Sequence, residues 1–273
     1  MEKATRRHFF HHGKDADEID KKLKDEKDRC HWCQLHDENS DEGSADHGHP
    51  AKERRKAYAY HTHGAKAGLL RSRVLDSATP LYECHLACSC DPLTCPNRVV
   101  QRGRTVPLQI FRTRNRGWGV RCPELIKKGQ FVDCYLGEVI TAAEADNRRQ
   151  KVKVSQRKDV YLFALDKFTS VDSFDPRLKG PPLEVDGEFM SGPTRFINHS
   201  CDPNMRIFAR VGDQADKHLH DLALFAIRDI PRGEELTFDY VAGGVDDHDE
   251  AGPNAGNMTE CLCGSKNCRK RIW

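Results

Sequence analysis

The sequence predicts a mainly β fold with short helices, flanked on both sides by cysteine-rich segments. Short runs of alternating or continuous apolar residues, separated by turns with Gly and Pro, recur from residue 107 to residue 240. The clearest helix start lies at Thr141. Dense groups of cysteines precede and follow this strand-rich part, which indicates bound metal at both of its borders.

The composition indicates a polar chain without an export signal. Of the 273 residues, 37% are hydrophobic and 32% are charged, and no run of about 18 apolar residues predicts a membrane span. The opening MEKATRRHFF lacks the apolar core of a signal peptide. A set of twelve cysteines therefore favours metal binding over disulfides. A net charge of +2 does not support a basic nucleic-acid surface.

The chain up to about residue 60 is charged and poor in apolar residues. Asp15–Lys27 is a candidate solvated helix with mixed acid and base pairs, and Asn39–Lys56 is expected to be disordered. The pair Cys30 and Cys33 is ambiguous by itself. We expect a mobile tail whose scattered histidines are exposed to solvent.

Four cysteines within twelve residues predict the first metal site: Cys84, Cys88, Cys90 and Cys95. Thiolates at this density predict a tetrahedral Zn²⁺, or a zinc cluster with bridging sulfurs, rather than core packing. Ala65–Leu75, which precedes them, is expected to be a short connecting segment. Cys122 and Cys134 stand apart from these groups and are interpreted as buried hydrophobic residues.

The middle of the chain alternates strands and turns. Four runs are predicted to be strands: Leu108–Arg112, Phe131–Leu136, Val160–Leu165 and His220–Ile227. The glycines of Arg116–Gly119 either let the backbone approach a ligand or make a plain hairpin turn. Thr141 and Glu144 form a capping box for a helix that runs toward Gln156. Ser170–Pro182 is expected to hold few regular elements.

Leu183–Met190 alternates apolar and acidic residues, which places Glu184, Asp186 and Glu188 on one strand face. Three like charges in a row need solvent or cations beside them. Two interpretations stay open: a basic peptide lies against this face, or the face is a plain solvated edge.

The chain is organised around two short stretches, RFINHSC at Arg195–Cys201 and ELTFDY at Glu235–Tyr240. The first holds an Arg, an Asn, a His and a Cys beside one Phe–Ile step, which is not the pattern of a core strand. Polar groups this dense all need partners if they are buried. In the second stretch, Phe238 and Tyr240 lie on the same side of a predicted strand.

The tail holds three more cysteines, Cys261, Cys263 and Cys268. Three thiolates are one ligand too few for tetrahedral zinc, and Cys201 is the natural fourth ligand. The stretch Val241–Thr259 before them is rich in Gly, Asp and Asn and is interpreted as a flexible linker.

Together these stretches resemble the SET-domain protein lysine methyltransferases. Within them, the chain is similar to the histone H3 lysine-9 enzymes of the suppressor-of-variegation branch, fungal members most of all. The resemblance covers Ala57–Trp273 and rests on motifs in the expected order: YECHLACSC, CPNRVVQRG, RGWGV, YLGEVIT, VDGEFMSGPTRFINHSCDPN, ELTFDY and CLCGSKNC. It implies a SET-domain fold of small curved sheets with a knot-like active site, flanked by pre-SET and post-SET zinc-binding segments.

The resemblance also divides the chain into parts. We expect a charged, largely disordered N-terminal segment with a partial pre-SET cysteine pair (1–56), a pre-SET zinc-binding region (57–103), the SET catalytic domain (104–242), a flexible linker (243–258) and a post-SET zinc-binding segment (259–273). In this family the two central stretches thread past each other to form the cofactor and lysine site.

Roles for individual residues follow from the resemblance. Tyr240 is expected to be the principal catalytic tyrosine, Tyr135 to line the lysine channel, and Phe238 to set how many methyl groups fit. Contacts to S-adenosylmethionine are expected from Gly117, Trp118, Gly119, Tyr161, Arg195, Phe196, Asn198, His199 and Trp273. Trp273 would also complete the channel from the tail. Structural zinc is expected on Cys30, Cys33, Cys84, Cys88, Cys90, Cys95, Cys201, Cys261, Cys263 and Cys268.

The chain departs from the family before the SET region. The family's pre-SET cluster uses nine cysteines for three zincs, whereas six are present here, and the family's chromodomain is absent. Two interpretations stay open. Either the sequence is truncated or mis-started, or it carries a reduced cluster that recruits a histidine such as His31, His36 or His85.

The resemblance implies transfer of methyl groups from S-adenosylmethionine to lysine 9 of histone H3, to the trimethyl state, in heterochromatin formation and gene silencing. The expected location is the nucleus, on the chromosome. Expected partners are the histone H3 tail in nucleosomes and heterochromatin adaptor proteins, without a membrane or sequence-specific nucleic acid. Two other classes compete: a zinc-dependent chromatin-binding module without catalysis, and a zinc-ribbon nucleic-acid binder.

Overall fold

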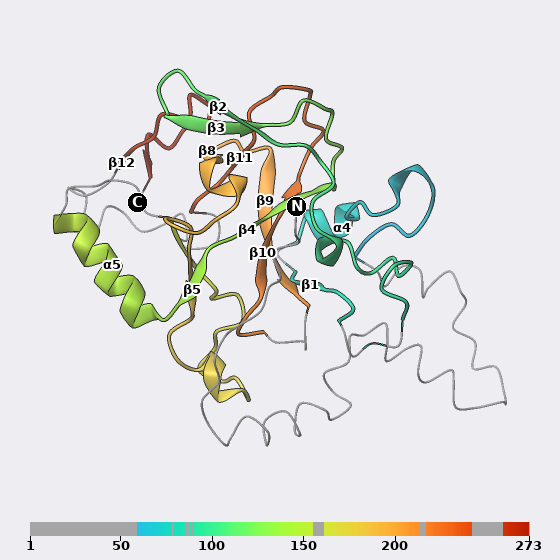
Figure 1. The fold of residues 1–273 in the computed structure, drawn as a ribbon, viewed down its shortest axis with the longest axis horizontal. Coiled ribbons are helices and arrows are strands. Elements are labelled where there is room, and N and C mark those ends of the chain that lie inside the picture. Colours follow the sequence, from blue (N-terminus) through green and yellow to red (C-terminus); the bar gives the residue numbers. More distant parts are fainter. Residues whose placement is uncertain are drawn as a thin grey trace.

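The computed structural model describes residues 59–77, 79–85, 88, 90–154, 161–212, 217–241 and 259–272 (Figure 1). The predictions for the N-terminal tail, for Cys30 and Cys33, for the linker at 243–258 and for Trp273 lie outside these residues. Within the described ranges, no helix combines the length and the apolar character that crossing a bilayer requires.

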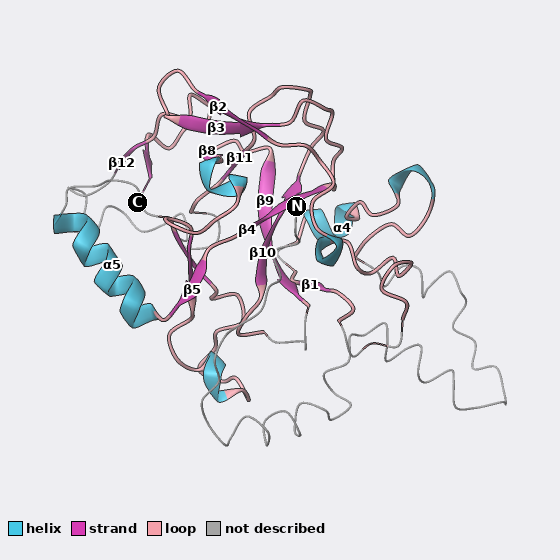
Figure 2. Cartoon of the chain, viewed as in Figure 1, coloured by secondary structure: helices cyan, strands magenta, loops and turns pink. Residues whose placement is uncertain are grey.

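Strands arranged in small sheets dominate the described residues (Figure 2), which confirms the mainly β fold class. The strands are β1 (Leu81–Tyr82), β2 (Gln109–Arg112), β3 (Trp118–Arg121), β4 (Phe131–Tyr135), β5 (Glu138–Ile140), β6 (Leu162–Ala164), β7 (Glu184–Asp186), β8 (Asn198–His199), β9 (Met205–Val211), β10 (Asp221–Ala226), β11 (Thr237–Phe238), β12 (Thr259–Glu260) and β13 (Arg271–Ile272). The helices described are α4 (Ser72–Leu75), α5 (Ala142–Val154) and the 3-10 turns η2 (Gly64–Lys66), η3 (Val100–Arg102), η4 (Pro176–Leu178) and η5 (Pro193–Phe196).

The largest described sheet has the order β1-β9-β10-β4. β10 is antiparallel to both β9 and β4, and β1 lies parallel to β9. Because strand side chains alternate, Leu224 and Ala226 of β10 enter one hydrophobic cluster, while Ala223 and Phe225 enter another. The sheet is therefore buried on both faces.

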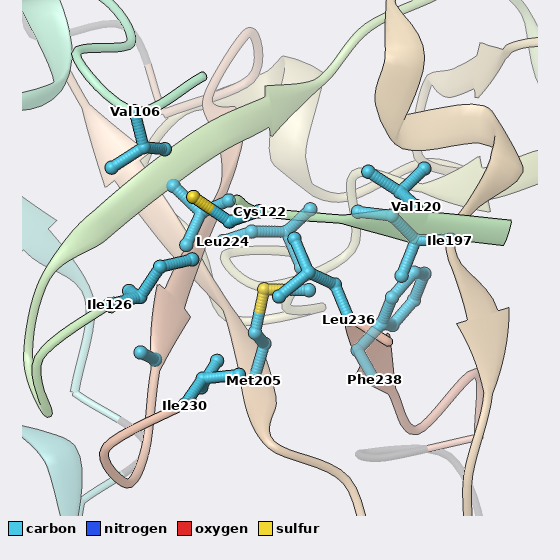
Figure 3. Packing of buried hydrophobic residues seen from close by; sticks show 12 residues of the cluster. Val106, Val120, Cys122, Ile126, Ile197, Met205, Leu224, Ile230, Leu236 and Phe238 are labelled. Carbon is cyan, nitrogen blue, oxygen red and sulfur yellow. The ribbon is translucent and has the colours of Figure 1, made fainter. Parts of the chain in front are cut away.

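The first cluster supports the central stretches of the chain. It joins residues of the sheet to Val120, Ile197, Leu236 and Phe238, which Figure 3 shows packed together. Cys122 belongs to this cluster and Cys134 to the second one, so both cysteines are buried hydrophobic residues, as predicted.

The second cluster attaches the described part of the chain before β2 to the sheet. Tyr60, Leu70 and Val74 pack there with Phe131 and Phe225. The prediction of a mere connecting segment at Ala65–Leu75 is therefore wrong, because its apolar residues cover one face of the sheet and its end forms α4.

The four predicted strands are present, each shorter than its apolar run, as β2, β4, β6 and β10. The predicted helix is α5, and the backbone N–H of Glu144 donates a hydrogen bond to Thr141 Oγ1 at 3.3 Å, as its N-terminal cap requires.

The acidic strand face needs a correction. β7 lies between β5 and β6, and the side chains of Glu184 and Asp186 are buried. Asp186 pairs with Arg148 of α5 at 2.5 Å, and Glu184 pairs with the neighbouring Arg149. Both interpretations offered for this face, a solvated edge and a bound basic peptide, are therefore wrong for these two acids. The cations come from α5, the helix beside the sheet in the same chain (Figure 1).

Candidate active site

The two central stretches meet side by side, as expected. β8, from RFINHSC, pairs in parallel with β11, from ELTFDY, so that Asn198 lies opposite Thr237 and His199 opposite Phe238. The Tyr240 hydroxyl donates a hydrogen bond of 2.5 Å to the carbonyl of Ile197. The apolar residues of both stretches face the first cluster, which leaves the polar ones to form a site.

Four aromatic side chains from three separate segments form one group at this crossing. Phe163 lies at its centre, with ring centroids 4.5 Å from Tyr135, 5.7 Å from Phe238 and 6.1 Å from Tyr240. Phe238 and Tyr240 are 4.8 Å apart. Sequence reasoning missed Phe163, although its place two residues after Tyr161 on a strand puts both on one side.

Tyr135 is held at the end of β4. Its hydroxyl donates a hydrogen bond to the carbonyl of Tyr161 at 3.0 Å, and the Gly187 N–H donates to the same carbonyl. Burial raises the pKa of Tyr135 above its ordinary value, and the nearby Tyr240 adds to the shift. The phenol therefore stays protonated across the physiological range.

Glu235 joins the hairpin β2–β3 to the crossing. Its carboxylate accepts hydrogen bonds from Arg116 at 2.5 Å and from Asn198 Nδ2 at 2.7 Å, and Asn198 also donates to the Trp118 carbonyl. A Cβ at Gly119 would lie 2.8 Å from Glu235 Oε1, so any other residue there would have to displace this carboxylate. Neither Arg116 nor Glu235 was predicted as a site residue, although both border motifs that were.

Arg195 has the geometry expected of a ligand-binding cation. Its guanidinium carbon lies 4.4 Å from the centroid of the Tyr161 ring and 5.1 Å from that of Phe196. Its Nε is buried and has no hydrogen-bond acceptor among the described residues. A buried N–H without an acceptor fits a site for an anionic group such as a carboxylate.

The remaining predicted cofactor residues lie at the start of β3 and on β8. Gly117 has a φ of +67° in the turn that precedes β3, and the Trp118 ring is half exposed beneath Arg112. His199 is buried, and the backbone N–H of Tyr240 donates to its Nδ1 at 3.2 Å. Burial lowers the pKa of His199 below its ordinary value, although Asp239 opposes this shift.

The tail cysteines and Cys201 come together in one group, the arrangement that the predicted metal site requires. The sulfurs of Cys201, Cys261, Cys263 and Cys268 all lie within 4.8 Å of one another. Four thiol sulfurs gathered in this way fit a tetrahedral Zn²⁺. β12 and β13 pair to form a short ribbon that carries the tail ligands.

The described cysteines before β2 come together only in part. Cys84, Cys90 and Cys95 lie within 4.8 Å of one another, while Cys88 packs against the group without joining this set. Cys95 shares a hydrogen bond with Cys84, and this bond lowers the pKa of Cys95 to about 6. The lowered pKa favours the thiolate form that a metal needs. The buried Arg98 donates to the Cys90 sulfur at 3.4 Å and offsets negative charge there.

Metal analysis of the purified chain is expected to give three zincs or fewer, with the tail site included. The six cysteines before β2 cannot fill the twelve ligand positions of three tetrahedral zincs, even if three sulfurs bridge. Inductively coupled plasma mass spectrometry of dialysed protein measures this ratio. A ratio of four would contradict the expectation and indicate that histidines complete the cluster.

The fold and this crossing define the class of protein: residues 117–241 match the SET domain family. The chain is 53% identical to a Fusarium mangiferae protein described as histone-lysine N-methyltransferase, H3 lysine-9 specific KMT1, covering 100% of this chain and 99% of that protein. It is 51% identical to the Neurospora crassa protein described as H3 lysine-9 specific dim-5, with 100% of both chains covered.

Solved structures agree with these relatives. The structure of the Neurospora SET domain protein DIM-5 has a TM-score of 0.65 and 68% identity over 76% of this chain and 75% of that one. Arabidopsis thaliana SUVH6 in complex with SAM has a TM-score of 0.60 and 31% identity, covering 79% of this chain and 41% of that chain. This chain belongs to the SET-domain histone-lysine N-methyltransferases.

Proposed function

We propose that this chain transfers methyl groups from S-adenosylmethionine to lysine 9 of histone H3. The observation that carries this proposal is the group formed by Tyr135, Phe163, Phe238 and Tyr240 at the crossing of β8 and β11. Two relatives more than 50% identical over the whole chain are described as specific for that lysine. The substrate places the enzyme on chromatin in the nucleus.

Arg195, Tyr161 and the hairpin residues hold the cofactor in this proposal. The Arg195 Nε, which has no acceptor among the residues that the structure describes, provides a donor for the cofactor's carboxylate, and Tyr161 and Phe196 keep the guanidinium in place. Gly117, Trp118, Gly119, Asn198 and His199 complete the binding residues, together with Trp273. When bound, S-adenosylmethionine supplies a methyl group on a positively charged sulfonium.

The aromatic group favours the neutral form of the substrate lysine, which is the form that accepts a methyl group. A free lysine is protonated at neutral pH because its pKa is about 10.4. The apolar walls made by Phe163 and Phe238 disfavour the ammonium form, so the pKa of the amine falls on entry. The Tyr240 oxygen still has lone pairs when its hydrogen donates to the Ile197 carbonyl, and it can orient the amine. Catalysis then comes from positioning and electrostatics.

The zincs are structural in this proposal. The tail site takes Cys201, Cys261, Cys263 and Cys268 as ligands, and the earlier site takes Cys84, Cys90 and Cys95 with Cys88 beside them. Cys30 and Cys33 are the further ligands proposed for the earlier site. The trimethyl product and a role with heterochromatin adaptor proteins belong to the same proposal.

Phe238→Tyr is expected to shift the product from trimethyllysine to mono- and dimethyllysine without eliminating turnover. Phe238 is buried and lies 4.8 Å from Tyr240, so a hydroxyl added to it would reach the region of the amine. One added hydrogen bond is worth roughly 0.5–1.5 kcal/mol, enough to change product ratios up to about tenfold. Mass spectrometry of an H3 peptide run to completion measures the ratio.

A conservative change at a neighbouring aromatic residue is the control for this variant. Tyr135→Phe removes a hydroxyl that is already bonded to the Tyr161 carbonyl and should slow the reaction without lowering the methylation state. If the parent stops at monomethyllysine, or if Phe238→Tyr trimethylates at the parent rate, this role of Phe238 is wrong.

A methyl-transfer assay with labelled cofactor tests the function itself. An H3 tail peptide should become labelled, whereas the same peptide with lysine 9 replaced by arginine should not. A chain that binds the peptide but never labels it would be a binding module instead. A chain that binds only nucleic acid would be the zinc-ribbon alternative.

A further inference from the structure

Two chains of hydrogen bonds among the described residues join Cys201, the member of the four-cysteine group that lies in the central stretch, to Tyr240. The first passes through His199. Its Nδ1 accepts the backbone N–H of Tyr240 at 3.2 Å, and its Nε2 lies 3.3 Å from the Cys201 sulfur. Since Nδ1 accepts, a neutral ring carries its proton on Nε2 and donates it to the sulfur. One imidazole thus spans a metal ligand and the backbone of Tyr240.

The second chain passes through Arg269. Its backbone N–H donates to the Cys201 sulfur at 3.3 Å. Its guanidinium binds both oxygens of Asp239, with Nη1 to Oδ2 at 2.9 Å and Nη2 to Oδ1 at 2.5 Å. Asp239 directly precedes Tyr240, and its Oδ1 also accepts the N–H of Val241 at 3.0 Å. The Asp239 carboxylate therefore belongs to the residue before Tyr240 and is bonded to the residue after it.

We propose that Arg269 is a positioning residue for Tyr240, so that closing the tail on its metal and placing this tyrosine are a single event. Arg269 directly follows Cys268, so the position of the Cys268 backbone in the four-cysteine group fixes where the Arg269 side chain begins. The bidentate pair with Asp239 then transmits that position to the next residue. Arg269 therefore acts on Tyr240 through Asp239.

A plain surface ion pair is the competing explanation. The Arg269 side chain is 42% exposed and that of Asp239 is 16% exposed, and exposed pairs contribute little to stability. This pair differs because each partner is one residue away from a functional group: a metal ligand on one side and Tyr240 on the other. Its effect should therefore fall on turnover rather than on thermal stability.

The test uses the full chain and four variants. Arg269→Gln removes the positive charge and the pair of hydrogen bonds that the guanidinium donates. Arg269→Lys keeps the charge but cannot donate that pair of bonds. Asp239→Asn removes the charge of the partner. The fourth variant combines Arg269→Gln with Asp239→Asn. Lys266→Gln, at an exposed base in the same tail, is the matched control. Three quantities are measured: kcat and KM for an H3 peptide with zinc present, zinc release to a chromophoric chelator, and thermal stability.

Arg269→Gln is expected to lower kcat about tenfold or more at saturating zinc, with KM for the peptide changed less than threefold. Zinc release should be faster than in the parent, because the open tail is no longer fastened to Asp239. Arg269→Lys should recover part of kcat, and Lys266→Gln should match the parent. The double variant should be no slower than the slower single variant, since both remove one contact.

Parental kcat in Arg269→Gln would overturn the proposal. The proposal would also be overturned if the loss of kcat in the double variant equalled the full combined losses of Arg269→Gln and Asp239→Asn. Faster zinc release with parental kcat would leave Arg269 as a residue that only retains metal. The proposal rests on the proposed function, and the two can fail separately. A parent without methyl transfer refutes the function, while zinc release still tests the connection between tail and Asp239.

Discussion

Replacing Cys263 by serine should reduce methyl transfer below detection, and a strong zinc chelator should do the same to the parent chain. Cys263 is one of the three tail cysteines whose sulfurs lie beside that of Cys201 in the central stretch. Binding free energy at a structural zinc is folding free energy, so loss of the metal releases residues 259–272 from the site. The contacts of Arg269 with Cys201 and with Asp239, which directly precedes Tyr240, are then lost. Zinc content and initial rate measure the two effects together.

Cys122→Ala is the control for this experiment. Cys122 is equally a thiol but lies in the hydrophobic cluster, away from both cysteine groups, so zinc content should stay at the parent value. Full turnover by a chain shown to have lost its tail zinc would refute the structural role of the metal.

Glu83→Gln should lower the free energy of unfolding by about 3 kcal/mol, the range seen when a buried ion pair loses one partner. Glu83 is buried, and its carboxylate accepts the Tyr60 hydroxyl at 2.6 Å and three successive backbone N–H groups at 99–101. It also pairs with the buried Arg210 at 3.0 Å. One carboxylate thus joins the segment before the SET region to β9.

Thermal unfolding measures this loss, with an expected fall in Tm of roughly 6–12 °C for a chain of this size. Glu124→Gln removes an exposed carboxylate of the same length and should leave Tm unchanged. An unchanged Tm in Glu83→Gln would show that the network is not needed to hold the segment.

Several features of the site could be predicted because they are local. The spacing of Cys261, Cys263 and Cys268 indicated a metal site one ligand short, and the sulfur of Cys201 lies where the fourth ligand belongs. The alternation in ELTFDY put Phe238 and Tyr240 on one side, and their rings are 4.8 Å apart. Strand positions followed from apolar runs in the same way.

Predictions failed where a partner comes from a distant segment. Glu184 and Asp186 looked like an exposed acidic face because the sequence pattern does not show that α5 lies against β7. Arg148 and Arg149 of that helix are 35 or more residues earlier in the chain and neutralise both acids. Ala65–Leu75 looked like a connection because short apolar segments do not reveal which sheet they cover.

The sequence by itself determined the family, the fold class and the residue types of the site, because motifs and metal-ligand spacing are short-range patterns. Only the tertiary structure decided how those residues are held. The contact of Arg116 with Glu235 joins residues 119 positions apart, and that of Glu83 with Arg210 joins residues 127 positions apart. The sequence around each residue does not indicate such a pair, since each charged side chain alone could equally be exposed to solvent. They become specific partners because folding brings them together and removes all or part of their contact with water, and a charge withdrawn from water requires a partner.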